Sequence, residues 1–111
     1  MGDDVKRFVL AQMVGGWFVG DFEPTAFRTS VAEVCYKTHS AGEAWPAHYH
    51  AVATEINLLV RGEMRLGDTV LRAGDIFTFS PNEIAAPTFV TDCELVVVKV
   101  PSVEGDKYVV P

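Results

Sequence analysis

The chain has 111 residues, of which 49% are hydrophobic and 22% charged, and its formal net charge is −6. This length accommodates one hydrophobic core, so we expect a single domain over residues 1–111. An acidic surface repels phosphate backbones and anionic lipid, which argues against nucleic acid and membranes as partners. The net charge still leaves room for a local basic pocket that binds a small anion.

The sequence shows no feature that points to export or to membrane insertion. No apolar run approaches the roughly 20 residues that span a bilayer. Asp3 and Asp4 stand where a secretory signal carries basic residues, so we expect a cytoplasmic protein. The cysteines, Cys35 and Cys93, belong to no C-x-x-C pair. In that compartment we expect free buried thiols, although the sequence leaves a pairing open.

Glycine and proline recur at short intervals, and the segments between them are rich in β-branched and aromatic residues. This pattern predicts many short strands separated by turns, with no sustained helical stripe. Such strands must hide their edges, so we predict an all-β jelly roll or closed barrel. The predicted strands are Phe8–Val14, Gly16–Val19, Val31–Thr38, Ala44–His50, Glu55–Val60, Glu63–Leu66, Thr69–Arg72, Ile76–Phe79, Thr88–Phe89, Glu94–Val100 and Lys107–Val110.

Two histidines carry the strongest chemical signal. His48 and His50 are one residue apart, and on a strand such side chains share a face. If residues 51–54 form a turn, Glu55 faces the pair from the next strand. Two imidazoles and a carboxylate suit one divalent transition metal, such as Fe, Mn, Ni, Co or Zn. A polar pair on the wet face of a strand would give the same local pattern.

The spacing around this pair resembles the first motif of the cupin family. Gly42, five residues, His48-x-His50, four residues, Glu55, six residues and Gly62 match it at each fixed position. The resemblance implies a double-stranded β-helix, or jelly-roll, barrel with a metal held by His48, His50 and Glu55. It also implies a homodimer, because cupins commonly pair through their sheets.

A second stretch, from Gly74 to Pro81, resembles the first half of the second cupin motif, which ends in a third histidine. Counted from Gly74 that histidine falls at Ala85, and counted from Pro81 at Ala86. Its absence leaves two readings open, a metal-free ligand pocket or a two-histidine, one-carboxylate metal site. A buried Glu55 without a cation is expensive, which favours the metal. Of the two alanines, we expect Ala85 to point inward.

The strand before the motif offers a further pocket candidate. Along it Glu33 and Lys37 alternate with Val34 and Tyr36. We expect the charged pair to face solvent and the apolar pair to face inward. Tyr36 is therefore a candidate pocket residue, able to donate a proton or anchor a ligand.

Three other polar residues lie in or near the two motif regions. Asn57 shares the face of Glu55 by alternation and is expected to line it. Glu83 lies near the missing histidine, either as a substitute ligand or as a charged turn residue. His39 ends the preceding strand, and we expect a turn residue there.

These features predict a metal-binding cupin that acts on a small organic molecule as an oxygenase, isomerase or lyase. One alternative is a non-catalytic or metal-free cupin that binds a small-molecule ligand. Another is a sugar-modifying cupin in which His48, His50 and Tyr36 move protons. Fold does not choose among these readings, because function belongs to the site.

Overall fold

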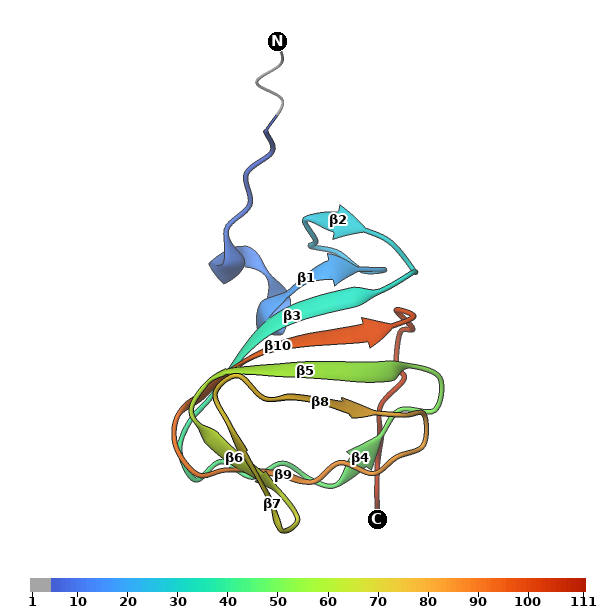
Figure 1. Ribbon diagram of the computed structural model, residues 1–111. Helices are drawn as coiled ribbons and strands as arrows, with labels where there is room; N and C mark the ends of the chain where they lie inside the picture. The colour runs from blue at the N-terminus through green and yellow to red at the C-terminus, as the bar shows by residue number, and fades with distance from the viewer. Residues whose placement is uncertain (1–4) are drawn as a thin grey trace.

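The computed structural model describes residues 5–111. Asp3 and Asp4, which argued against a secretory signal, lie outside the described residues. The chain is built of strands with two short 3-10 turns at its start, so the predicted all-β class is confirmed (Figure 1). The elements are η1 (Leu10–Gln12), η2 (Val14–Gly16), β1 (Trp17–Gly20), β2 (Phe27–Arg28), β3 (Glu33–His39), β4 (His48–Tyr49), β5 (Thr54–Arg61), β6 (Glu63–Leu66), β7 (Thr69–Arg72), β8 (Ile76–Phe79), β9 (Pro87–Phe89), β10 (Cys93–Val100) and β11 (Tyr108–Val109).

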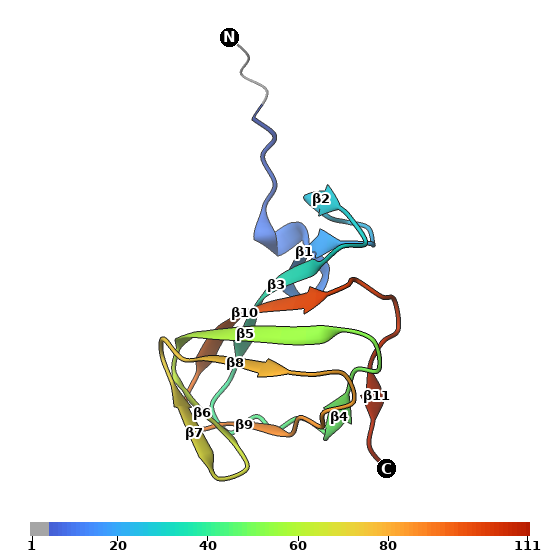
Figure 2. The same ribbon diagram turned by 45° about the vertical axis from the view of Figure 1, so that its right-hand side comes forward.

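The strands form one large sheet and two small ones. The large sheet has the order β2-β1-β3-β10-β5-β8, and the small sheets are β7-β6-β9 and β11-β4. Figures 1 and 2 show the small sheets lying together across from β10, β5 and β8, as the second layer of a jelly roll. An isolated bridge between His48 and Ala85 links β4 to the segment before β9.

Alternation along the large sheet divides core from surface. On β5, Asn57 and Leu59 are buried while Ile56, Leu58 and Val60 are exposed. Leu59 is fully buried, and truncating such a leucine to alanine costs about 2–5 kcal/mol. The buried core cluster consists of Cys35, Leu59, Met64, Leu71, Phe89, Cys93, Leu95 and Val97.

Both cysteines belong to this core. Cys35 and Cys93 are buried and free, as expected. Burial raises the pKa of the Cys35 thiol to about 12, so this thiol stays protonated and unreactive at neutral pH.

The N-terminal part differs from the prediction. The predicted strand Phe8–Val14 is wrong, because η1 and η2 occupy this stretch. Gly16 has a φ of +81°, a left-handed conformation that ends any extended run. The short strand β2 was missed, and the predicted strand Ala44–His50 is regular only over β4. Pro46 lies within that stretch and has no N–H to donate to a ladder.

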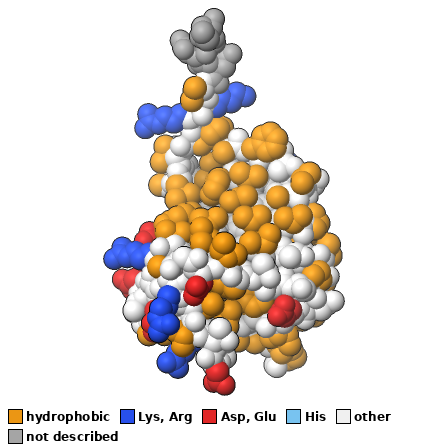
Figure 3. Space-filling view, viewed as in Figure 1, with side chains coloured by type: hydrophobic (Ala, Val, Ile, Leu, Met, Phe, Trp, Pro, Cys, Tyr) orange, Lys and Arg blue, Asp and Glu red, His pale blue; other side chains and the backbone are white. Residues whose placement is uncertain are grey.

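The outer face of the large sheet is apolar. Ile56, Leu58 and Val60 of β5 and Ile76 of β8 are all exposed on it. Space-filling shows hydrophobic side chains gathered across the middle of the molecule, over these strands (Figure 3). Within residues 5–111, no helix is both long enough and apolar enough to cross a membrane.

Candidate functional site

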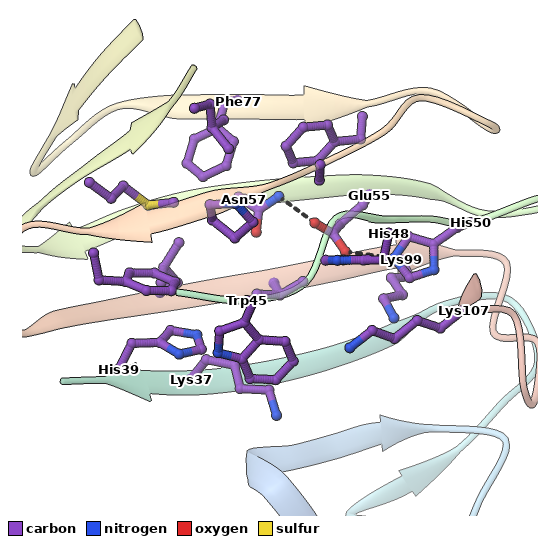
Figure 4. Close-up of a pocket in the computed structure, with 18 of the residues that line it drawn as sticks. Lys37, His39, Trp45, His48, His50, Glu55, Asn57, Phe77, Lys99 and Lys107 are labelled. Atoms are coloured by element: carbon purple, nitrogen blue, oxygen red, sulfur yellow. Dashed lines mark hydrogen bonds and ion pairs between the residues drawn. The ribbon is translucent and has the colours of Figure 1, made fainter. Parts of the chain in front are cut away.

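A cavity between the layers brings together side chains from most of the sheet elements (Figure 4). All three histidines of the chain line it, together with Glu55, Asn57 and three lysines. The remaining walls are apolar or aromatic. A largely apolar cavity with a few convergent polar groups is the usual form of a small-molecule site.

The predicted histidine pair faces this cavity with defined tautomers. His48 Nδ1 lies 3.1 Å from the carbonyl oxygen of Pro46, and His50 Nδ1 contacts the carbonyl oxygen of Asp106. A carbonyl oxygen only accepts, so both Nδ1 atoms carry a hydrogen, and Nε2 is the ring nitrogen that each histidine turns away from the main chain. The ring centroids are 5.5 Å apart. Burial lowers the pKa of His48, which keeps its imidazole neutral.

Glu55 of β5 joins the pair, as the spacing predicted. Its Oε1 lies 3.1 Å from His50 Nε2, and its Oε2 accepts a hydrogen bond of 2.9 Å from Asn57 Nδ2. Burial raises the pKa of Glu55, but the hydrogen bonds from His50 and Asn57 and the charge of Lys99 outweigh it, so the pKa lies below its usual value. The group is therefore a carboxylate aimed at an imidazole nitrogen.

Asp106 fixes the turn that separates the ligand candidates. Its carboxylate accepts the N–H groups of Ala51 at 2.8 Å, Val52 at 3.1 Å and Ala53 at 2.9 Å. Its carbonyl oxygen accepts the Nδ1–H of His50. Burial raises the pKa of Asp106, but these backbone hydrogen bonds outweigh it and hold the pKa below its usual value. No local sequence pattern predicts this role, because the contact depends on the pairing of β11 with β4.

His39, expected in a turn, instead lies on β3 and lines the cavity. Its Nδ1 is 2.5 Å from Glu43 Oε2, which also accepts a 2.6 Å hydrogen bond from Trp45 Nε1. These two hydrogen bonds lower the pKa of Glu43. The ring stacks on Phe89 with centroids 4.0 Å apart. A carboxylate at Nδ1 leaves Nε2 able to accept a proton from a ligand.

Lys37 of β3, Lys99 of β10 and Lys107, which precedes β11, also line the cavity. The ammonium groups of Lys37 and Lys99 lie 5.7 and 4.9 Å from the Trp17 ring centroid. That of Lys107 lies 4.3 Å from the centroid of Trp45. Each cation therefore rests on an aromatic face. The expectation that Lys37 faces solvent was wrong.

The inward and outward faces of β3 are the reverse of those predicted, so Tyr36 also lies away from the site. Cys35 of β3 is fully buried, so its neighbour Tyr36 points to the opposite face. The Tyr36 hydroxyl donates a 3.0 Å hydrogen bond to Glu94 outside the cavity. Glu83 is also outside, where its carboxylate accepts the N–H of Ser80 at 3.0 Å in an exposed turn. Of the pocket candidates Tyr36, Glu83 and Asn57, only Asn57 lines the cavity.

The structure shows which of the two alanines occupies the inward position of the missing histidine. Ala85 exchanges backbone hydrogen bonds of 2.8 and 2.9 Å with His48, is buried and lines the cavity. Ala86 is exposed. The inward position is the one counted from Gly74, as expected.

Comparison with known proteins rests on structure alone. No protein-family model matches the sequence, and no curated protein matches it. An uncharacterised protein with a double-stranded β-helix domain from Klebsiella pneumoniae superposes with a TM-score of 0.66, at 20% identity over 73% of this chain and 71% of that one. This chain has the cupin fold.

Two further structures with this fold have named activities. The DMSP lyase DddQ from Ruegeria pomeroyi superposes with a TM-score of 0.70, at 18% identity over 93% of this chain and 59% of the lyase. KdgF from Halomonas sp. gives a TM-score of 0.64, at 17% identity over 68% of this chain and 74% of that one. Identities this low establish the fold of this chain and not its activity.

The role of Asp106 can be tested by replacement. Asp106→Asn weakens several charge-assisted hydrogen bonds, and we expect it to lower the free energy of unfolding by about 1–3 kcal/mol at pH 7. Because the folded pKa lies below the unfolded value of 3.8, the carboxylate stabilises the fold above that pH and loses its effect as pH falls. The difference between the proteins should therefore shrink below about pH 4.

Urea denaturation of both proteins at a series of pH values measures this difference. Asp68→Asn, in an exposed hairpin turn, is the matched control and should change stability by less than about 0.5 kcal/mol. A difference for Asp106→Asn that is absent at pH 7, or independent of pH, would contradict the assigned role.

Proposed function

We propose that this cupin is an enzyme that binds one divalent transition metal through His48, His50 and Glu55 and acts on a small organic molecule in the cavity. The observation that carries the proposal is the fixed orientation of both histidine rings. Main-chain carbonyls hold Nδ1 of each ring, which is the arrangement that orients metal-binding imidazoles through Nε2. The carboxylate of Glu55 lies beside the same two rings.

The donor set fits a transition metal in type, with two imidazoles and one carboxylate. Within residues 5–111, no group of three or more such side chains is already arranged as a metal site. Glu55 is hydrogen-bonded to His50, so binding requires this contact to be exchanged for bonds to the ion. A bound ion would supply Lewis-acid polarisation of the substrate.

The chain's own groups supply proton transfer and orientation. His39, held by Glu43 and stacked on Phe89, would accept a proton at Nε2 from a substrate in the cavity. Aromatic and aliphatic walls would exclude water from that step. A base of this kind favours a lyase or isomerase over an oxygenase, and the lyase among the similar structures supports an enzymatic role.

A second candidate is a metal-free cupin that uses the histidines themselves for proton transfer. The direct contact between His50 Nε2 and Glu55 Oε1 favours it, because such a pair shares a proton without a metal. Tyr36 has no part in this candidate, since its hydroxyl is outside the cavity. His39 is the better proton carrier.

Metal content distinguishes the two candidates. Protein purified without chelator and without a histidine tag should contain about one transition-metal ion per chain, since one donor set is present. The double variant His48→Ala, His50→Ala should lose it, because a carboxylate alone binds such ions weakly. Elemental analysis gives the ratio, and circular dichroism checks the fold. Metal retained by the double variant would exclude this site, and metal-free wild type with activity would support the second candidate.

Ala85 provides a gain-of-ligand test. Ala85→His adds an imidazole opposite His48 in the cavity, and we expect metal affinity to rise on the order of 10–100-fold. Ala86→His is the matched control, because Ala86 is exposed and its side chain points away. Competition with a chromogenic chelator measures both affinities. Equal affinities in the three folded proteins would argue against a metal at this place.

We further propose that the chain forms a homodimer through the outer face of the large sheet. Ile56, Leu58, Val60 and Ile76 expose a continuous apolar surface there. A second copy covers such a face with the same apolar residues when the two chains are related by a two-fold axis. Apolar patches of this kind mark association surfaces in soluble proteins.

Light scattering at micromolar concentration should therefore give the mass of a dimer. Leu58→Glu places a charge at the centre of the face and should yield a folded monomer, because burying an unpaired carboxylate is costly. Thr69 is the exposed first residue of β7, in the other layer, so Thr69→Glu should leave the dimer intact. A monomeric wild type, or a dimeric Leu58→Glu variant, would refute the interface.

A further inference from the structure

The charge inside the cavity is opposite in sign to the charge of the protein. Three lysines line the cavity, and among residues 5–111 Glu55 is the only acidic residue that lines it. The whole chain has a formal net charge of −6. In Figure 4, Lys37, Lys99 and Lys107 lie on the side of the cavity away from Phe77, and they come from β3, from β10 and from the segment before β11. Evenly scattered surface lysines would not converge in this way.

Little within the protein neutralises these lysines. Lys99 lies between Glu33 and Glu55 in a row across β3, β10 and β5, and its Nζ is 3.9 Å from Glu33 Oε1. Within residues 5–111, Lys37 and Lys107 have no carboxylate within the 4.0 Å of an ion pair. Burial, followed by the charges of Lys99 and Lys37, lowers the pKa of Lys107. The three ammonium groups therefore repel one another.

The aromatic contacts position the ammonium groups without removing their charge. Trp17 lies beneath Lys37 and Lys99, and Trp45 lies beneath Lys107. Cation–π contacts hold each group in place while its N–H donors remain free for a ligand. A positive, partly water-excluded cavity concentrates anions by its field.

We propose that the cavity binds a small organic carboxylate, with its anionic group held by Lys37, Lys99 and Lys107. Lys99 is the direct cross-strand neighbour of Glu55. The part of the ligand beyond its carboxylate would therefore lie against His48, His50 and Glu55. This inference deepens the proposed function by naming its substrate class, but it does not require the metal. No arginine lines the cavity, and no helix end or glycine-rich loop offers the N–H cradle typical of phosphate sites.

The probes are acetate, succinate and benzoate, each paired with its neutral amide. Calorimetric titration of the purified protein at low ionic strength should show binding of at least one carboxylate and much weaker binding of its amide. The affinity should fall as salt is added, because the attraction is screened. Quenching of tryptophan fluorescence should follow the same curve, since Trp17 and Trp45 contact the lysines.

Variants assign the binding to the lysines. Lys37→Gln and Lys107→Gln should each weaken carboxylate binding by about tenfold, the effect of losing one charge-assisted contact. Lys6→Gln removes a charge outside the cavity and should leave affinity unchanged. Both cavity variants remove mutual repulsion between cations, so they should fold at least as well as the wild type.

Four outcomes overturn the inference. They are equal binding of acid and amide, unchanged affinity in both folded lysine variants, no binding of any of the three carboxylates, or binding of inorganic phosphate in preference to all of them. The metal is tested separately. If His48→Ala, His50→Ala loses its metal but keeps lysine-dependent carboxylate binding, the anion site stands by itself. If metal is present but carboxylates do not bind, only the anion site fails.

Discussion

The candidate site depends on the hydrogen bonds that Asp106 accepts from residues 50–53. Its carboxylate gathers the N–H groups of residues 51–53, and its carbonyl oxygen orients His50. That short turn is the only chain between His50 and Glu55, so its shape decides whether their side chains meet. The pairing of β11 with β4 brings Asp106 to this place. The following residue, Lys107, enters the cavity by the same pairing.

Strand alternation distributes the rest of the site. At one end of the cavity β10 and β5 point Lys99 and Glu55 inward, and further along they point Val97, Leu95 and Leu59 inward. Glu33, Lys99 and Glu55 form one row across these strands, and Cys35, Val97 and Asn57 form the next. A shift of register by one residue in β10 would remove Lys99 from the site and expose Leu95 and Val97. The core and the site therefore depend on the same pairing.

The sequence predicted what is local and missed what is assembled from distant strands. His48, His50 and Glu55 lie within eight residues of one another, so strand period and one turn suffice to place them together. Asp106, Lys99 and Lys107 reach the site only through strand order, which no local pattern encodes. The phase of β3 was predicted wrongly because Val34 and Tyr36 belong to an outer face that is itself apolar. Polarity does not separate inside from outside on such a strand.

The methyl group of Ala85 leaves space directly beside His48. In the motif that this stretch resembles, an imidazole fills that position. Here the same volume would be open to the proposed ligand, which would touch backbone and aliphatic carbon on that side. Recognition there depends on shape, and an extra methyl group on a ligand changes its fit by only about 1–3 kcal/mol. In the proposed complex the lysine side of the cavity would therefore select for charge, while the Ala85 side would tolerate ligands of different size.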